Sequence, residues 1–441
     1  MTQALPASSD VLVMGGGPAG STAATLLARR GWHVTLVEKQ HHPRFHIGES
    51  LLPMNMPVLD RLGVLDKVHA IGVKKLGADF PANNARGYNV FRFSRALDAA
   101  WPYAYQVRRE EFDQLLFAHA RDNGAHTFEG VRVTALSFGK DGVTAALETE
   151  SGEQRTLRAR YIVDATGRDT FLGGTLRLKR KHPKHQSAAL FAHFRGVQLR
   201  AGEDAGNISI YRFEHGWIWM IPLRDGCVSV GAVCFPEYLK QRTGGNDQFL
   251  MQTLQSIPDV WKRMEGAEIV GNLHVTGNYS YVCRRISGRG WIMAGDAYAF
   301  LDPIFSSGVY LAMTSAELAA GVVDATLKEP RREAGLQRAY ERHVKRGIHA
   351  LSWFIFRFTS PAMHYLFANP RNVFGVEQAM ISMLAGDVFS NRNVTWRLRI
   401  FKLIYLIASL NQWKEAWANA RRRKRQIVAE FRGGTTSQDH V

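Results

Sequence analysis

The stretch VLVMGGGPAGSTAATLLARRGWHVTLVEK, residues 11–39, decides the fold. An apolar run leads into Gly15-x-Gly17-x-x-Gly20, small helix-forming residues follow, and a second apolar run ends at Glu38. Strand, glycine-rich turn, helix, strand and acidic residue, in this order, are the fingerprint of a Rossmann-type unit that binds a dinucleotide. The stretch therefore predicts an α/β fold whose first unit holds such a cofactor.

Each position of the fingerprint has its own physical task. Gly15 permits the tight turn, Gly17 the close approach of a pyrophosphate, and Gly20 the close packing of helix on strand. Glu38 is predicted to bind the ribose hydroxyls of the adenosine half. The neighbouring residues predicted to contact the same cofactor are Pro18, Ala19, Ser21 and Lys39. The fingerprint alone does not separate FAD from NAD.

Composition narrows the class of protein. The chain has 441 residues, enough for two or three domains, and its 46% hydrophobic content supports a packed core. Its three cysteines show no C-x-x-C spacing, which argues against zinc ligands and a disulfide framework and favours a reducing cytoplasm. The first residues lack a secretion signal, and the apolar run Leu403–Leu410 is too short to span a bilayer. We expect a cytoplasmic protein with no transmembrane segment and no metal.

The formal net charge of +17 bears on partners. No zinc-finger, RNA-binding or helix-turn-helix pattern accompanies it, so nucleic acid is not expected as a partner. A solvated basic surface explains the charge as well as an acidic protein partner or a negatively charged substrate carrier does. The basic run Arg421–Arg425 leaves similar alternatives open: a solvated helix end, or contact with anionic lipid, nucleic acid or an acidic carrier protein.

The segment after the second strand indicates the cofactor. Residues 43–53, PRFHIGESLLP, resemble the PRxxIGESLLP stretch of flavin-dependent halogenases and their relatives, the prenyl reductases. Both belong to a wider group of flavoproteins that includes the aromatic hydroxylases. In that group the segment lies against the flavin, so the resemblance implies FAD. The flavin contacts that it implies here are Arg44, Ile47, Gly48, Glu49 and Ser50.

Further segments carry the same resemblance, which covers about residues 10–430. Residues 106–113, QVRREEFD, are similar to the family's QVxRxxFDxxL pattern, and residues 164–167 resemble its D-A-x-G turn. Gly295-Asp296-Ala297 follows an apolar, strand-like run, and the Asp296 carboxylate can accept a hydrogen bond from a ribityl hydroxyl. The further cofactor contacts that we expect are Gln106, Arg109, Val131, Asp164, Ala165, Gly167, Gly295, Asp296, Pro303, Gly308 and Val309.

Two adjacent lysines, Lys74 and Lys75, raise the question of which one, if either, has a functional role. Adjacent lysines on a loop or strand are usually only solvated. Here Lys75-x-Gly-Ala-x-Phe resembles the segment that carries the catalytic lysine of the halogenases, and Lys75 fits its spacing better than Lys74. The resemblance implies that Lys75 hydrogen-bonds hypohalous acid or forms a haloamine, and so makes the halogen electrophilic.

A tryptophan pair occurs in residues 216–222, GWIWMIP. Period two places Trp217 and Trp219 on one face of a strand, an arrangement that most often serves core packing. The segment resembles the G-W-x-W-x-I-P motif of the halogenases, whereas prenyl reductases typically show one aromatic residue there. The resemblance implies that both tryptophans line the route between flavin and substrate.

Residues 303–308, PIFSSG, constrain the halide and the substrate. Gly308 opens a helical pattern, and the amides of Ser307 and Gly308 can face an anion. The resemblance implies that this anion is chloride or bromide. Halogenases of free tryptophan carry a glutamate where this chain has Phe305, and that glutamate would stabilise the charge developing on an indole. Its absence disfavours free tryptophan and favours a phenol or a pyrrole, free or bound to an acyl carrier protein.

The predicted architecture has three parts and a tail. A Rossmann-type FAD-binding domain comprises residues 1–75, 105–185 and 275–340, and a mixed β-sheet substrate domain, residues 76–104 and 186–274, is inserted into it. A helical region covers residues 341–432, and residues 433–441 form a polar tail. Arg177 to Lys184 are expected to form a surface connection between the first two domains.

The resemblance implies a halogenase that receives FADH2 from a separate NADH-dependent flavin reductase and uses oxygen with chloride or bromide. An aromatic monooxygenase or a prenyl reductase on the same fold is the alternative, although Lys75 and the tryptophan pair argue against it. A third reading is a flavin-binding protein without catalysis. Substrate identity, halide preference, regiochemistry and oligomeric state stay open at this point.

Overall fold

A computed structural model describes residues 4–82, 87–98, 100–389 and 391–433. Its first sheet has the strand order β16-β17-β10-β1-β2-β7, with β9 beside β10 and β8 beside β9. β1 pairs in parallel with both β10 and β2, and the antiparallel hairpin β8–β9 extends the sheet. The strands are β1 (Ser8–Met14), β2 (Val34–Val37), β7 (His126–Phe128), β8 (Val131–Gly139), β9 (Gly142–Thr149), β10 (Gln154–Asp164), β16 (Ser287–Gly288) and β17 (Trp291–Met293).

Helices cover this sheet because its central strands are apolar on both faces. Residues 11–13 of β1 have no exposed surface, as expected for a parallel strand between two layers. α1 follows β1 directly, with Gly17 before its first turn and Pro18 within it, and packs on α4 and α9. The long helices here are α1 (Pro18–Ala28), α4 (Arg109–Asp122), α9 (Gly308–Lys328) and α10 (Glu333–Ile355), and shorter ones are α2 (Met56–Leu62), α3 (Leu65–Ile71) and α5 (Phe171–Thr175).

The second sheet has the order β18-β15-β11-β14-β13-β12-β4-β5 and is antiparallel except where β12 pairs with β4. Period two divides the side chains of β13 between two cores: Trp217 and Trp219 face one core, while Ile218 and Met220 face the helices α7 and α8. The strands are β4 (Gly77–Pro81), β5 (Tyr88–Arg92), β11 (Lys179–Arg195), β12 (Ile208–Phe213), β13 (Gly216–Pro222), β14 (Val228–Cys234), β15 (Glu268–Cys283) and β18 (Ala299–Phe300); the helices are α6 (Pro236–Leu239), α7 (Asn246–Gln255) and α8 (Pro258–Met264).

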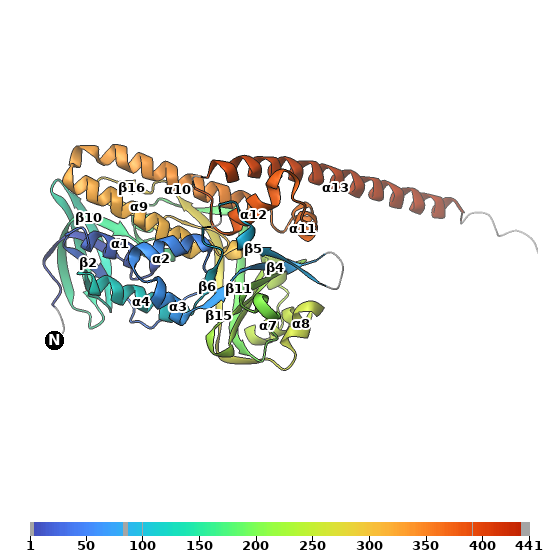
Figure 1. Cartoon of the computed structure of the whole chain (residues 1–441), viewed down its shortest axis with the longest axis horizontal. Coiled ribbons are helices and arrows are strands. Elements are labelled where there is room, and N and C mark those ends of the chain that lie inside the picture. The colour runs from blue at the N-terminus through green and yellow to red at the C-terminus, as the bar shows by residue number, and fades with distance from the viewer. Residues whose placement is uncertain (1–3, 83–86, 99, 390, 434–441) are drawn as a thin grey trace, which may run out of the picture.

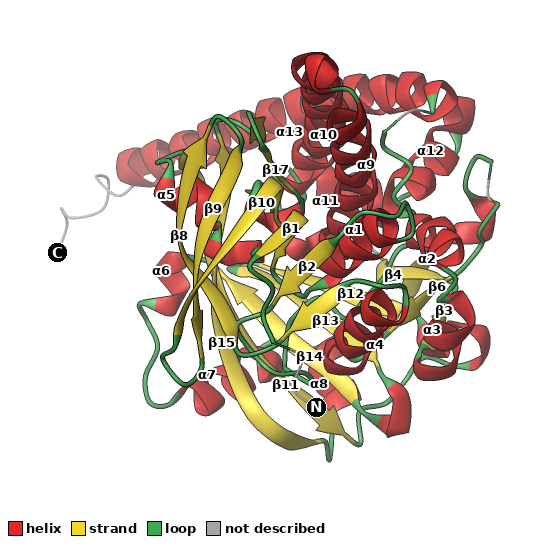
Figure 2. Ribbon diagram, turned by 90° about the vertical axis from the view of Figure 1, so that its left-hand side faces the viewer, coloured by secondary structure: helices red, strands yellow, loops and turns green. Residues whose placement is uncertain are grey.

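A third layer is helical and closes the chain. α11 (Pro361–Ala368), α12 (Val376–Leu384) and α13 (Arg392–Gly433) pack beside β4 and β5, and α13 continues well beyond the rest of the molecule (Figure 1). A two-stranded sheet of β3 (Val73–Lys75) and β6 (Ala104–Gln106) lies between the layers. Figure 2 shows the strands of both sheets in yellow and the helices α9, α10 and α13 in red at the top of the view.

The observed elements agree with the predicted fold class, an FAD-binding α/β fold with a helical C-terminal region. One local expectation was wrong: Arg177 to Lys184 do not form a connection, because β11 begins at Lys179 and pairs with β15. The proposed domain boundaries at residues 185 and 275 fall within these two long strands, and the division stays a prediction. From residue 434 on, the predicted tail lies outside the described residues. No helix in the described part of the chain is long and apolar enough to cross a bilayer.

Candidate active site

A cavity of about 270 Å³ extends from the glycine-rich turn after β1 to β13 of the second sheet. Its wall contains most of the residues predicted to bind the cofactor: Gly15, Gly17, Pro18, Ala19, Glu38, Lys39, Arg44, Ile47, Gly48, Glu49, Ser50, Arg109, Ala165, Gly167, Asp296, Pro303, Gly308 and Val309. Trp217 and Trp219 line the same cavity from β13. These residues come from six separate segments of the chain, which converge on one space.

Two of the three fingerprint glycines, Gly15 and Gly20, are required by the packing of the chain itself. Gly15 has φ +100°, and a Cβ there would lie 2.4 Å from the Ala165 carbonyl oxygen. A Cβ on Gly20 would lie 1.8 Å from the carbonyl oxygen of Gly15, so helix and turn can only touch without side chains. Gly17 is different, because a Cβ there would meet only the Arg44 guanidinium, at 3.6 Å. The N-terminus of α1 thus stays open toward the cavity, which fits a pyrophosphate.

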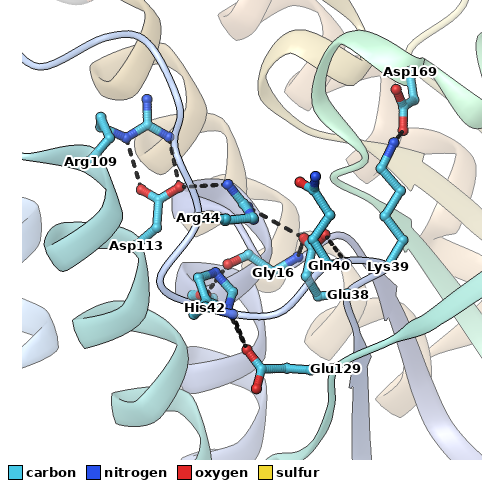
Figure 3. Close-up of polar contacts among 11 residues, drawn as sticks. Gly16, Glu38, Lys39, Gln40, His42, Arg44, Arg109, Asp113, Glu129 and Asp169 are labelled. Carbon is cyan, nitrogen blue, oxygen red and sulfur yellow. Dashed lines mark hydrogen bonds and ion pairs between the residues drawn. The ribbon is translucent and has the colours of Figure 1, made fainter. Parts of the chain in front are cut away.

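Charged side chains close one end of the cavity (Figure 3). Glu38 accepts hydrogen bonds from the amide of Gly16 at 2.8 Å and from Arg44 at 3.3 Å. Arg109 holds Asp113 through two hydrogen bonds of 2.8 and 2.9 Å, and Arg44 reaches the same carboxylate at 3.2 Å. The network ties the segment after β2 to the start of α4, so the cavity wall is fixed by ion pairs rather than by loop packing alone.

Burial and neighbouring charge set the ionisation of this network. Burial would raise the pKa of Asp113, but the charge and hydrogen bonds of Arg109, together with Arg44, hold it below its ordinary value. Burial, and then the positive charge of Arg109, lower the pKa of His46 to about 4. His46 is therefore neutral at physiological pH, and its Nδ1 lies 2.8 Å from the carbonyl oxygen of Ile47. The Arg44 Nε has no hydrogen-bond partner among the described residues, which suits a polar ligand beside it.

The far end of the cavity is formed by the loop before α9. Asp296 lines it, and no described residue donates a hydrogen bond to its carboxylate. Burial raises the pKa of Asp296 to about 6, with Arg168 and Arg109 opposing the rise. The amide end of α9 opens at Gly308, where a Cβ would meet nothing within 4 Å. A carboxylate acceptor and an open helix N-terminus fit the ribityl chain and ring of FAD.

Lys75 and Lys74 occupy different environments. Lys75 is 1% exposed, and its ammonium nitrogen donates to the Ser50 hydroxyl at 2.9 Å and to the Leu51 carbonyl at 3.1 Å. Burial lowers the pKa of Lys75 from 10.5 to about 7. Lys74 is exposed and lies 4.9 Å from the Tyr103 ring. Because Ser50 lines the cavity, the Lys75 amine lies directly behind the cavity wall.

The tryptophan pair is fixed from two sides. The rings of Trp217 and Trp219 lie 5.6 Å apart, and the Trp219 indole nitrogen donates to the Ser229 hydroxyl at 3.1 Å. The carboxylate of Asp302 accepts from the Ile304 amide at 3.2 Å and lies beside the Trp217 indole. Burial raises the pKa of Asp302 to about 7, and the Ile304 amide and the Trp217 indole limit the rise. Asp302 therefore connects β13 to the loop that carries Phe305.

Several predicted site residues lie behind the cavity wall instead of lining it. Gly20 and Ser21 are inside α1, Gly295 donates to Ser315, and Asp164 accepts from the amides of Thr166 and Leu172. Gln106 donates to the Gly206 carbonyl, and Val131 lines a neighbouring cavity of about 400 Å³. Phe305 is 3% exposed and Ser307 is 2% exposed, and neither lines the cavity, whereas Ser306 does.

Sequence reasoning missed other lining residues, chiefly His46, Thr166, Arg168, Asp169, Phe300 and Ser306. Arg168 donates to the Thr276 hydroxyl at 2.7 Å and lies 4.6 Å over the Phe300 ring, and so connects both sheets. Asp169 forms an ion pair with Lys39 across the cavity mouth (Figure 3). Arg168 and Asp169 follow directly after the D-A-x-G turn, and this position in the sequence could have indicated both residues. The described residues include no group of three or more His, Cys, Asp or Glu suited to a metal.

A phenylalanine wall separates this site from a second cavity of about 530 Å³. From the loop before α9, Phe305 contacts Phe358 at 5.5 Å between ring centroids, and Phe358 contacts Phe367 at 5.6 Å. Phe367 in turn lies 5.4 Å from Phe91, and these two rings line the second cavity together with α12 and α13. The second cavity is mostly apolar and opens on the helical layer.

Fold and cavity together define an FAD-binding flavoprotein. In agreement, residues 8–352 match the family described as FAD binding domain. A tryptophan 2-halogenase of Chondromyces crocatus is 38% identical over 355 residues, which cover 78% of this chain and 67% of that protein. The chain belongs to the flavin-dependent halogenases.

Further relatives span nearly the whole chain. A 1H-pyrrole-2-carbonyl-[peptidyl-carrier protein] chlorinase of Pseudomonas fluorescens is 29% identical over 415 residues, covering 87% of this chain and 90% of that protein. A flavoprotein/dehydrogenase of Cytophaga hutchinsonii superposes with a TM-score of 0.84 at 29% identity, covering 92% of this chain and 100% of that one. The flavin-dependent brominase Bmp2 gives a TM-score of 0.79 at 26% identity, covering 90% and 99%.

Proposed function

We propose that this halogenase chlorinates or brominates an electron-rich arene, a phenol or a pyrrole, free or presented on an acyl carrier protein. The observation that carries the proposal is Lys75, a fully buried lysine held by Ser50 immediately behind the FAD cavity. FAD, supplied in reduced form by a separate NADH-dependent flavin reductase, would activate oxygen for the oxidation of halide to hypohalous acid.

Lys75 is the proposed catalytic residue. With a pKa of about 7, its side chain is an ammonium donor in part of the molecules and a free amine in the rest. The ammonium form would hydrogen-bond hypohalous acid. The amine would attack its halogen, so that an N–halogen bond forms, the O–halogen bond breaks, and hydroxide leaves with a proton from nitrogen as water. An arene carbon then takes the halogen, the N–halogen electron pair returns to nitrogen, and the ring loses its proton.

Other residues prepare this step. The amides of Ser307 and Gly308, at the N-terminus of α9, are the proposed halide site, because backbone N–H groups bind an anion without supplying an acidic proton. Trp217 and Trp219 are proposed to line the oxidant's route to Lys75, and their large apolar rings exclude water from it.

The proposed substrate class rests on Phe305 and on charge. Phe305 is buried against Phe358, so no carboxylate at this position would stabilise a cation on an indole. A phenolate or a pyrrole does not need that stabilisation. A carrier-bound substrate is supported by the net charge of +17 and by the name of the pyrrole-carrier chlorinase. The name of the tryptophan 2-halogenase makes free tryptophan the second candidate.

The test is mass spectrometry of products from a panel of phenols, pyrroles and tryptophan, free and carrier-bound, with FAD, a flavin reductase, NADH and either halide. Lys75→Ala is expected to bind FAD and consume oxygen yet release no halogenated product, while the neighbouring Lys74→Ala continues to halogenate. Halogenation by Lys75→Ala removes the lysine assignment. Products that contain oxygen and do not depend on halide support a monooxygenase. FAD binding without any turnover supports a flavin-binding protein without catalysis.

A further inference from the structure

The outer face of α13 is apolar and exposed. Its side chains recur at three-, four- and seven-residue spacings, which place them on one side of the helix. These residues, here called the α13 stripe, are 43–59% exposed: Trp396, Leu403, Leu406, Ile407 and Leu410. The opposite side of the helix, with Val394, Leu398 and Phe401, is buried against α10, α11 and α12. The helix thus has two apolar faces, and the described part of the chain covers one of them.

Positive charge accompanies the stripe. Residues 392–413 contain four basic residues and no acidic residue. At one edge, the Arg357 guanidinium and the Lys402 ammonium lie 4.6 and 5.0 Å from the Trp353 ring. Burial and then the charges of Arg357 and Arg399 lower the pKa of Lys402, so three cations lie close together. No carboxylate among the described residues pairs with any of the three.

The opposite edge of the stripe continues the apolar surface. Val373 and Phe374, on the loop before α12, are 49% and 72% exposed, and Arg397 of α13 donates to the Phe374 carbonyl at 3.2 Å. Ile407 belongs to the stripe and also lines the second, 530 Å³ cavity. The stripe and the mouth of this apolar cavity therefore lie side by side. The stripe side chains are themselves 43–59% exposed, and α13 continues past the body of the molecule (Figure 1).

Charge decides between possible occupants. A second copy of this chain would bring two bodies of net charge +17 together with their unpaired cations facing each other, which is unfavourable. An anionic lipid surface satisfies both features, because leucine, isoleucine and tryptophan insert at the acyl boundary while Arg and Lys meet phosphates. We propose that α13 docks the protein in the plane of an anionic bilayer, with the α13 stripe inserted below the headgroups. The proposal goes beyond the halogenation reaction and does not depend on it.

Co-sedimentation of the FAD-loaded full chain with sucrose-filled vesicles tests the proposal. One vesicle population is neutral phosphatidylcholine, and the other is an equal mixture with phosphatidylglycerol. The expected binding is at least about tenfold stronger to the anionic vesicles and at least about tenfold weaker in high salt, because exposed charges are screened. Tryptophan fluorescence should shift to the blue when Trp396 enters the interface.

A matched pair of variants separates the stripe from bulk charge. Leu403→Glu/Ile407→Glu/Leu410→Glu changes side chains that are more than half exposed, and Phe138→Glu/Leu199→Glu/Val275→Glu makes the same charge change at exposed apolar positions elsewhere. The first variant is expected to lose at least about tenfold in binding to anionic vesicles, and the second to keep most of it. FAD absorbance of each variant checks that the fold is intact.

Four results would overturn the proposal. The first is wild type that stays in the supernatant with anionic vesicles at low salt. The second is an equal loss of binding by both triple variants, which would assign the binding to net charge alone. The third is a dimer, seen by light scattering, that only the stripe variant dissociates, which would assign the face to a second copy. The fourth is an acidic carrier protein that binds the stripe while vesicles do not.

Discussion

Replacing Lys75 by methionine should change how the stability of this protein depends on pH. The buried Lys75 has a pKa of about 7, against 10.5 for an exposed lysine, so forcing its ammonium form into the core costs about 5 kcal/mol. Methionine leaves the Ser50 hydroxyl and the Leu51 carbonyl without this partner, which costs about 1–3 kcal/mol for each and so offsets about 2–6 kcal/mol of that gain. Near neutral pH, Lys75→Met is therefore expected to lie between about 1 kcal/mol less stable and about 3 kcal/mol more stable than wild type.

The direction in which stability changes with pH follows from the number of protons that the folded and unfolded chains bind. Between pH 7 and pH 10.5 the unfolded chain binds a proton at Lys75 that the folded chain does not, so folding releases it and wild-type stability rises with pH. The contribution of this one group is about 1.4 kcal/mol per pH unit. Methionine removes it, and the stability of Lys75→Met relative to wild type should fall by about 3 kcal/mol from about pH 7.5 to about pH 9.5.

Urea unfolding of wild type, Lys75→Met and Lys74→Met at three pH values measures this difference. Lys74→Met replaces the exposed neighbour on the same strand and is expected to follow wild type at every pH. Parallel curves for wild type and Lys75→Met would refute the reasoning, since they would mean that the Lys75 amine is as solvated in the folded chain as in the unfolded one.

Three other perturbations test the site. Glu38→Ala removes the acceptor of the Gly16 amide and of Arg44, and we expect the Kd for FAD, from fluorescence titration, to rise at least about tenfold; an unchanged Kd would contradict the role of Glu38. Asp302→Asn should raise the free energy of unfolding by about 1–2 kcal/mol at pH 8. This gain is smaller than the pKa of about 7 alone suggests, because the side chain is half-buried and solvent screens its charge. The gain should vanish as the pH falls from 7 to 3.8, and calorimetry at pH 8 and at pH 3.8 checks this. Gly231→Ala places a Cβ 2.3 Å from the Trp219 ring and should cost about 1–3 kcal/mol with altered near-UV circular dichroism, whereas Gly321→Ala in α9, with nothing within 4 Å, should not.

Local patterns were enough to predict much of the site. The strand–turn–helix around residues 11–39 follows from glycine spacing and apolar runs, because those constraints act within a few residues of one another. Period two placed Trp217 and Trp219 on one face, and the structure has both facing the cavity. The choice of Lys75 over Lys74 came from family spacing alone, and burial now separates the two physically.

The remainder depended on contacts between distant segments. Arg44, Arg109 and Asp113 form one network although 69 residues separate Arg44 from Asp113, and no local pattern indicates that pairing. The proximity of Trp217 to the carboxylate of Asp302 is likewise a contact between distant segments that no local pattern indicates. The basic residues at the start of β11 were predicted to form a surface connection because charged residues give no local indication of a strand. They form a strand because they pair with β15.

The phenylalanine wall between the two cavities has an evolutionary consequence. Phe305, Phe358 and Phe367 lie in a row between the loop before α9 and the second cavity, so residues beyond them, such as Val376 and Met380, can change without touching any group that holds the cofactor. Mutations there are expected to be nearly neutral for FAD affinity and fold. If arenes are selected on that side of the wall, new specificities can accumulate in α11–α13 while the oxidative half of the enzyme is inherited unchanged.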